Sequence, residues 1–124
     1  HDALPISVDE TTGEELTPLA HRSSRRVFSA QTAEKLQELL AGVVAEGTGR
    51  QAAPSEGAAA GKTGTAQTGQ FRDGEELKNH WFAGFYPAEK PRWTIVVMQD
   101  AQTEPEVSSA AVFARLCDAL SAGE

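Results

Sequence analysis

The stretch EGAAAGKTGTAQTG, residues 56–69, is compatible with two unrelated folds, each with its own chemistry. Its Gly-Lys-Thr could end a phosphate-binding loop, whereas its Lys-Thr-Gly-Thr could be a strand that receives a carboxylate. The first interpretation requires a strand followed by a nucleotide-binding helix. The second requires a sheet with a free edge, so the neighbouring residues have to decide between them.

The phosphate-binding interpretation fails on spacing. A Walker A loop has the pattern G-x-x-x-x-G-K-[ST], in which glycines let backbone N–H groups surround a phosphate. Its second glycine would be Gly61, but Glu56 stands five residues earlier and Gly57 is one residue too close. The preceding segment GRQAAPSEG is not an apolar strand, and Gly64 interrupts the helix that should follow. The pattern therefore disfavours a nucleotide-binding enzyme.

The strand interpretation places two hydroxyls together. Side chains alternate between the faces of a strand, so Thr63 and Thr65 share one face, about 7 Å apart, and Lys62 and Gly64 share the other. Hydroxyls near an ammonium suit an anionic carboxylate. Gly64 lets a substrate backbone approach an open strand edge, and the Thr65 N–H can face a developing oxyanion. The alternative is an exposed, glycine-containing strand without a ligand.

Composition limits the classes of protein. A chain of 124 residues with 40% apolar residues suits at most one domain with a real core. The formal charge is −7, from 18 acidic and 11 basic residues, which argues against nucleic acid as a partner. Cys117 is the only cysteine and is expected to be buried. His1, His21 and His80 lack ligand spacing, so neither a metal nor a cofactor is expected.

Periodicity predicts two helices. Apolar residues at helical spacing predict the first over residues 30–46, with Ser29 as its N-cap and Gly47 at its end. A second apolar stripe predicts a helix over residues 105–121, with Pro105 in its first turn. Both helices are expected to cover a face of the sheet.

Three strands are predicted between the helices, over residues 58–68, 81–86 and 93–98. Residues 69–79 are expected to form a loop or hairpin tip around Asp73-Gly74. The continuous apolar run 93–98 predicts a strand covered on both faces. Near the start, the alternation of Leu4, Ile6 and Val8 predicts a short strand, followed by a turn and a second short segment around Leu16. Short links favour antiparallel pairing, so the fold class is α+β.

Several segments together resemble one family. AGKTGTAQTG (60–69) is followed by NHWFAGFYP (79–87) and WTIVVM (93–98). Upstream lies RRVFSAQTAEKLQELLAGVVAEGTGRQA (25–52), and downstream lies VFARLCDAL (112–120). In order and spacing these segments resemble the C-terminal part of the transpeptidase domain of class B penicillin-binding proteins. The resemblance covers residues 25–120, whereas residues 1–24 match only loosely, as a hairpin and linker.

The resemblance implies a partial transpeptidase fold of the β-lactamase type, an antiparallel sheet flanked by helices. Residues 1–124 would then be a C-terminal fragment of one domain, with a hairpin and linker over 1–28 and the helix, KTG strand, hairpin and closing helix over 29–124. The family cross-links peptidoglycan: a serine attacks the D-Ala-D-Ala end of a stem peptide, and an amine of a second peptide takes the acyl group. β-Lactams mimic that donor.

By the same resemblance, Lys62 supplies positive potential and organises the site. Thr63 and Thr65 bind the donor carboxylate, Gly64 admits the substrate, and the Thr65 N–H forms half of the oxyanion hole. Gln67 would contact substrate at the cleft edge, unless it is an ordinary strand residue. Lys62 and Thr65 are therefore the expected catalytic residues of this chain.

Two other motifs of the family are absent from the 124 residues. No serine is followed by lysine three residues later or by asparagine two residues later, so S-x-x-K and S-x-N are both missing. We therefore expect the chain to have no acyl-transfer activity alone. Because sheet strands of the parent domain would also be missing, residues 81–86 and 93–98 should expose apolar surface, which predicts self-association or a complementing N-terminal part.

Two alternatives remain open from the sequence: a non-catalytic module that binds a carboxylate or peptide, and a fragment of a serine β-lactamase. If the family resemblance holds, the partners of the complete domain are the stem peptide and β-lactams. The implied location is the extracytoplasmic face of a bacterial membrane, with an anchor upstream of this chain.

Overall fold

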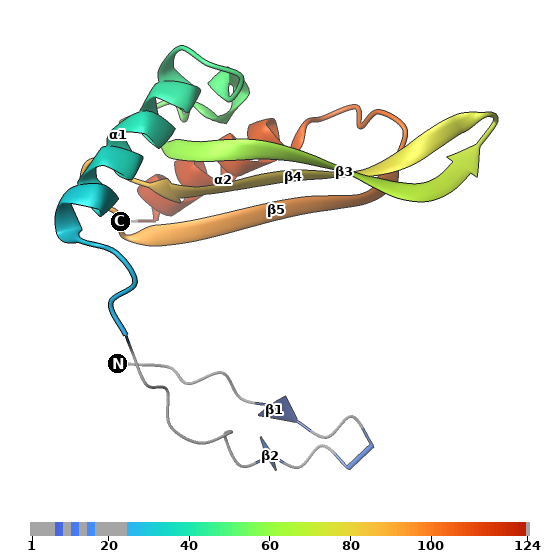
Figure 1. Cartoon of the computed structure of the whole chain (residues 1–124), viewed down its shortest axis with the longest axis horizontal. Coiled ribbons are helices and arrows are strands. Elements are labelled where there is room, and N and C mark those ends of the chain that lie inside the picture. Colours follow the sequence, from blue (N-terminus) through green and yellow to red (C-terminus); the bar gives the residue numbers. More distant parts are fainter. Residues whose placement is uncertain (1–6, 9–10, 13–14, 17–24, 124) are drawn as a thin grey trace.

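A computed structural model of the chain describes residues 7–8, 11–12, 15–16 and 25–123. Figure 1 shows helices beside a long sheet whose strands pair antiparallel, which confirms the α+β fold class. The described elements are β1 (Ser7–Val8), β2 (Glu15–Leu16), α1 (Ala30–Ala45), a short 3-10 helix η1 (Arg50–Ala52), β3 (Ala60–Arg72), β4 (Glu75–Tyr86), β5 (Trp93–Gln102) and α2 (Ser109–Ala122).

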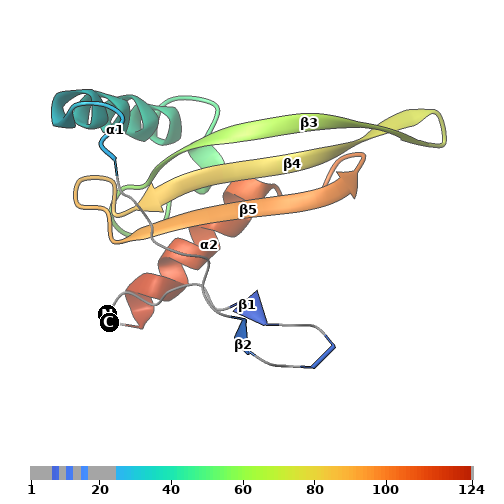
Figure 2. The ribbon, with the colours of Figure 1, turned by 60° about the horizontal axis from the view of Figure 1, so that its bottom comes forward.

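The main sheet has the strand order β3-β4-β5, and both of its pairs are antiparallel. Among the described strands, β3 and β5 are therefore the two edges. Helix α2 packs against one face of the sheet, whereas α1 lies beside the first part of β3 (Figure 2). The free edge of β3 required by the carboxylate-binding interpretation is thus present.

The core lies between the sheet and α2. Phe82 of β4 and Phe113 of α2 are fully buried, with their ring centroids 4.6 Å apart. Cys117, one helical turn further along α2, is also fully buried, as the sequence predicts. These side chains form one cluster with Val44 of α1. The core therefore ties the closing helix to the middle strand.

Strands β3 and β4 extend as a hairpin arm beyond the rest of the sheet (Figures 1 and 2). The hairpin tip predicted at Asp73-Gly74 is confirmed, because these two residues, both with positive φ (53° and 86°), connect the strands. This is the geometry of a tight type I′ hairpin. The alternative of a loop over 69–79 is wrong, because the strands continue up to this turn. Polar residues form these strands because the two backbones satisfy each other's hydrogen bonds while the side chains face solvent.

Strand β5 is covered on one face only. Trp93, Ile95 and Val97 pack against the core, whereas Val96 and Met98 are 58% and 45% exposed. The expectation of a strand covered on both faces is therefore wrong for this chain. The second expectation, of exposed apolar surface, is confirmed, and Trp81 of β4 adds to it at 38% exposure.

The two helices begin at serine caps. Ser29 Oγ accepts the Thr32 N–H at 3.1 Å, as predicted for α1. Ser108 Oγ accepts the Ala111 N–H at 3.1 Å, so α2 starts at Ser109. The expected start at Pro105 is wrong, because Ser108, three residues after Pro105, is the N-cap and the helix begins only at the next residue.

Helix α1 covers less of the sheet than predicted. Its Leu36 and Leu39 are 43% and 59% exposed, and only Val44 is buried. The amide of Gln37 donates to the Ala88 carbonyl and, at 3.0 Å, to the Glu89 carbonyl. These contacts hold α1 beside β3 and the β4–β5 turn rather than over the open face of the sheet.

The N-terminal strands β1 and β2 pair antiparallel, with Ser7 opposite Leu16 and Val8 opposite Glu15. This agrees with the predicted strand, turn and second segment, although Leu4 and Ile6 lie outside the described residues. Within the described part of the chain, neither helix has the length and apolar character needed to cross a bilayer.

Candidate functional site

The register of β3 and β4 places the predicted site residues on opposite faces. Thr63 lies opposite the buried Phe82 and Thr65 lies opposite His80, so both threonines face the side that α2 covers. Lys62 lies opposite Ala83 on the open face, as does Gly64 opposite Trp81. The alternation predicted for Lys62-Thr63-Gly64-Thr65 is therefore present in the sheet.

The lysine nevertheless reaches the threonine. Lys62 Nζ donates to both the carbonyl oxygen and the hydroxyl oxygen of Thr63, each at 3.1 Å. The Thr63 hydroxyl then accepts from an ammonium and keeps its own proton for a ligand. A positively charged donor beside a free hydroxyl proton favours an anion over a neutral ligand.

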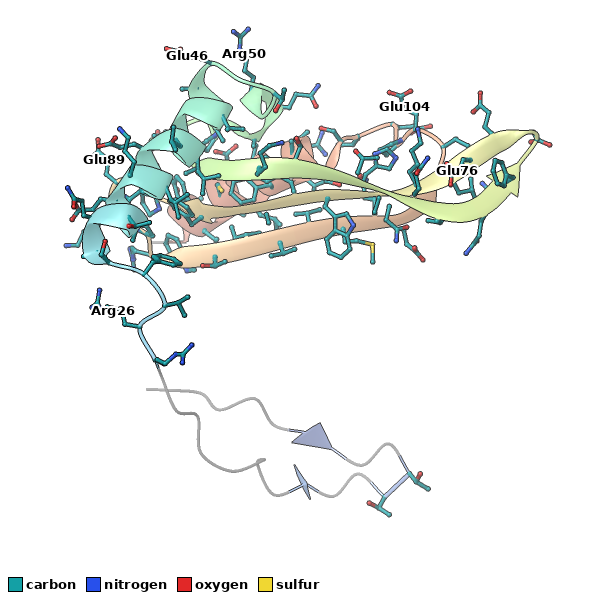
Figure 3. All side chains as sticks on the ribbon, viewed as in Figure 1. Arg26, Glu46, Arg50, Glu76, Glu89 and Glu104 are labelled. Atoms are coloured by element: carbon teal, nitrogen blue, oxygen red, sulfur yellow. The ribbon has the colours of Figure 1, made fainter. Side chains whose placement is uncertain are left out.

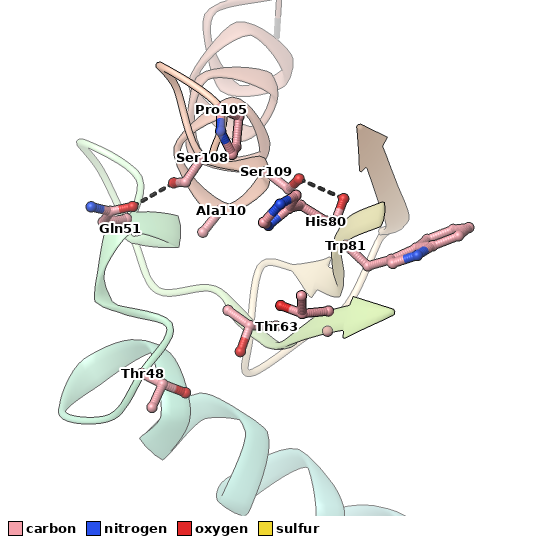
Figure 4. Close-up of a pocket in the computed structure, with 11 residues that line it drawn as sticks. Thr48, Gln51, Thr63, His80, Trp81, Pro105, Ser108, Ser109 and Ala110 are labelled. Atoms are coloured by element: carbon pink, nitrogen blue, oxygen red, sulfur yellow. Dashed lines mark hydrogen bonds between the residues drawn. The ribbon is translucent and has the colours of Figure 1, made fainter. Parts of the chain in front are cut away.

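A cavity of about 120 Å³ lies beside this strand, between β3, β4, η1 and the start of α2 (Figure 4). Its walls are rich in hydroxyl, amide and imidazole groups and contain no carboxylate. The lining residues are Thr48, Gln51, Thr63, Gly64, Thr65, His80, Trp81, Pro105, Ser108, Ser109 and Ala110. The N-terminus of α2 adds partial positive charge at the same place. This environment suits a small anionic group.

Hydrogen bonds fix the far wall of the cavity. The Ser109 hydroxyl lies 2.8 Å from the His80 carbonyl oxygen and 2.9 Å from Oε1 of Gln99, with its single proton shared between them. The Ser108 hydroxyl donates to the Gln51 side-chain oxygen, which joins η1 to α2 (Figure 4). Gln99 Nε2 donates to the Val107 carbonyl at 2.8 Å. The start of α2 is therefore held firmly against β4 and β5.

Gln67 is not brought to the cavity. Its side-chain amide donates to Oε2 of Glu76 at 2.8 Å, and the other oxygen of Glu76 accepts the Gly69 N–H at 3.1 Å. Glu76 thus holds an irregular part of the arm, where β3 has extra residues relative to β4 (Figure 3). The role expected for Gln67 at the cleft edge stays a prediction.

The sequence did not identify His80 as a site residue, yet its imidazole lines the cavity. Ser108, Ser109 and Gln51 were also missed, because they come from two separate elements. In the described part of the chain, no group of three or more His, Cys, Asp or Glu residues could hold a metal ion. Burial, with a smaller contribution from Asp118, raises the pKa of the Cys117 thiol to about 11, which does not suit a nucleophile.

Comparison with known proteins tests the family resemblance. Residues 8–118 match the model of the penicillin binding protein transpeptidase domain. The chain belongs to the penicillin-binding protein transpeptidase family. Stage V sporulation protein D of Bacillus subtilis is 38% identical over 96 residues, covering 75% of this chain and 14% of that protein. Penicillin-binding protein PbpB of Mycolicibacterium smegmatis is 38% identical over 110 residues, covering 77% of this chain and 16% of that protein.

Solved structures of the family show the same fold. The transpeptidase domain of Burkholderia pseudomallei penicillin-binding protein 3 aligns with a TM-score of 0.70 at 26% identity, covering 95% of this chain and 35% of that one. The D,D-transpeptidase domain of a peptidoglycan glycosyltransferase from Eggerthella lenta aligns with a TM-score of 0.62 at 31% identity, covering 93% and 26%. This transpeptidase-family chain therefore spans about a third or less of those structures.

Proposed function

We propose that this chain is the C-terminal portion of a peptidoglycan D,D-transpeptidase domain and forms the wall that binds the acyl donor. The observation that carries the proposal is the Lys62 ammonium on the Thr63 hydroxyl, at the free edge of β3 beside a polar cavity. The family membership supports it, because the matched structure from Eggerthella lenta is a D,D-transpeptidase domain.

The donor carboxylate would take the hydroxyl protons of Thr63 and Thr65, with Lys62 supplying positive charge. Gly64, on the exposed strand between them, would let the peptide backbone of the donor lie against β3. The Thr65 N–H would stabilise the negative charge that develops on the carbonyl oxygen when the acyl bond is attacked. Lys62 and Thr65 are thus the catalytic residues that this chain contributes.

The nucleophile would come from outside these residues, because S-x-x-K and S-x-N are absent from the chain. A serine of the remaining domain would attack the penultimate D-Ala carbonyl and release the terminal D-Ala. An amine of a second stem peptide would then attack the acyl-enzyme and regenerate the serine. In this scheme the chain alone is inactive.

The remaining part of the domain would cover the open face of the sheet. Trp81, Val96 and Met98 leave apolar side chains exposed there, and β5 has a free edge among the described strands. Such a surface favours packing with a complementing N-terminal part or, in its absence, with a second copy. By its family, the complete protein would act at the extracytoplasmic face of a bacterial membrane, anchored by an upstream segment.

Fluorescent penicillin tests the proposal directly. The complete domain that includes the coding sequence before His1 is expected to be labelled covalently, and the isolated chain is not. Thr63→Val should reduce labelling of the complete domain by about tenfold or more. Thr94→Val is a matched control, because Thr94 is an exposed threonine on β5 of the same sheet.

The outcomes separate the proposed function from its alternatives. Labelling of the isolated chain would contradict the inactive-fragment proposal. Reversible binding of a peptide carboxylate by a complete gene product that is never labelled would favour the binding module instead, since the chain lacks both serine motifs. Rapid turnover of the labelled intermediate would favour a serine β-lactamase.

A further inference from the structure

The cavity beside β3 is lined by the imidazole of His80, which has a buried nitrogen without a hydrogen-bond partner. Among the described residues, Nε2 of His80 is the one buried side-chain nitrogen or oxygen without a hydrogen-bond partner. Buried polar atoms are nearly always paired, and an unpaired one costs free energy in the folded state. An orphaned nitrogen in the wall of a binding cavity therefore points to a partner that forms when the site is occupied.

His80 and Thr65 are direct neighbours across the strands. They are opposite each other in the β3–β4 register, and side chains in such a pair have Cβ atoms about 5 Å apart. Both residues line the cavity, and the Thr65 side chain is exposed. Rotation about a single side-chain bond of Thr65 can thus turn its hydroxyl oxygen toward the imidazole.

The backbone of His80 is fixed from the other side. The Ser109 hydroxyl, at the start of α2, lies 2.8 Å from the His80 carbonyl oxygen. Figure 4 shows the imidazole between the first residues of α2 and the strand that carries Thr63. Because helix and strand hold the histidine on both sides, the adaptable partner in the pair is Thr65.

We propose that His80 is a positioning residue for the carboxylate-binding hydroxyl of Thr65, a role that rests on the function proposed above. When a donor carboxylate accepts the Thr65 hydroxyl proton, the same hydroxyl oxygen accepts the Nε2 N–H of His80. The two hydrogen bonds polarise each other and fix the rotamer of Thr65. No proton is transferred between the imidazole and the hydroxyl, so His80 orients the hydroxyl and does not act as an acid or base.

The test compares ligands with and without the carboxylate. Second-order acylation rate constants of the complete domain are measured with benzylpenicillin and with its methyl ester. His80→Leu is expected to slow acylation by the free acid about tenfold and to leave the slower ester reaction unchanged. His80→Gln, whose amide nitrogen can occupy the place of Nε2, should stay within about threefold of the unaltered domain.

Two further variants make the result decisive. In a Thr65→Val background His80→Leu should have no additional effect, because the hydroxyl it positions is already gone. If His80→Leu does not fold, His80→Asn replaces it, since its shorter amide does not reach the Nε2 position and should be impaired where His80→Gln is not. Melting curves of each variant establish that the domain is folded.

Several results would overturn the role of His80. These are equal losses for the acid and the ester, equal impairment in His80→Gln and His80→Leu, or independent losses that multiply in the double variant. A failure of the proposed function looks different. In that case the unaltered domain is not acylated by benzylpenicillin at all. If the domain is acylated normally and the His80 variants have the same acylation rate constants, only the inference about His80 is overturned.

Discussion

The Lys62 ammonium donates to the Thr63 hydroxyl at 3.1 Å, although the two side chains leave opposite faces of β3. The lysine can do so because β3 is an edge strand, so its long side chain can bend around the free edge. A positive charge is thereby placed against the hydroxyl of Thr63, which lines the polar cavity, although Lys62 itself is not among the lining residues. None of the residues that line the cavity carries a carboxylate that could neutralise this ammonium.

Removal of this charge should impair acylation without affecting the fold. Lys62→Met in the complete domain keeps most of the side-chain length and is expected to lower the penicillin acylation rate about 10- to 100-fold, because hydrogen bonds involving charged groups are the strong ones. Lys62 is exposed, so the melting temperature should barely change. Lys90→Met, at an exposed lysine in the β4–β5 turn, is the control. An unaltered rate in Lys62→Met would contradict the role of the ammonium.

The ring pair of Phe82 and Phe113 should dominate the stability of the chain. Phe113→Ala removes a fully buried ring and is expected to cost about 3–5 kcal/mol in the free energy of unfolding. Phe71→Ala removes a ring that is 68% exposed on the hairpin arm and should change stability by about 0.5 kcal/mol or less. Urea unfolding measures both. Similar losses for the two variants would show that the arm, and not only the core, stabilises the sheet.

The strands β3 and β4 approach too closely at Gly84 for any side chain. A Cβ there would lie 2.3 Å from the Ala60 carbonyl oxygen and 3.0 Å from Cζ of Phe113. Gly84→Ala should therefore destabilise the chain by about 1–3 kcal/mol. Gly42→Ala is the matched control in α1, where a Cβ has no neighbour within 4 Å, and it should stabilise the chain by about 0.5–1 kcal/mol. If thermal melts show that both variants raise the melting temperature, or that both lower it, the predicted packing is contradicted.

The thiol of Cys117 should make stability depend on alkaline pH. Burial, with a smaller contribution from Asp118, raises its pKa from an ordinary 9.0 to about 11. The unfolded chain then loses the proton at lower pH than the folded chain, so the contribution of this group is fully present below about pH 9 and is lost as the pH rises to about 11. Over that range the unfolding free energy should fall more steeply for the unaltered chain than for Cys117→Ala. Parallel pH profiles would contradict this assignment.

The sequence predicted the fold where local signals agree with the packing. Ser29 caps α1 as expected, and the aromatic and aliphatic runs both form strands. The polar arm was missed because its strands gain little from burial and are stabilised by pairing with each other. The coverage of β5 was also mispredicted, since a continuous apolar run indicates what could be buried and not what lies against each face.

The pairing of His80 with Thr65 could not be predicted from the sequence because of one irregularity in the register. From the turn, Arg72 pairs with Glu75 and Phe71 with Glu76, but Gln67 pairs with Lys78. Three residues of β3, 68–70, therefore face a single residue of β4. Simple counting from the turn would place Thr65 opposite Phe82, two residues away from its actual neighbour His80. The positive φ of Gly69 and the two hydrogen bonds of Glu76 are the physical basis of this shift.

The open face of the sheet should make the isolated chain self-associate. Val96 and Met98 are neighbouring outward residues of β5, the strand whose second edge is unpaired among the described strands. Replacing either with lysine should weaken association about tenfold, because each removes apolar surface from the contact and adds a charge to it. Thr94→Lys places the same charge on the same face, removes no large apolar side chain and should weaken association less.

Sedimentation velocity over a range of concentrations measures this association, and the complete domain provides the reference. If the remaining part of the proposed domain occupies the same face, the complete domain should remain monomeric where the isolated chain does not, and Val96→Lys should then lower the melting temperature of the complete domain. A monomeric isolated chain with a cooperative melt would contradict the prediction, because the exposed face would then be tolerated in water without any partner.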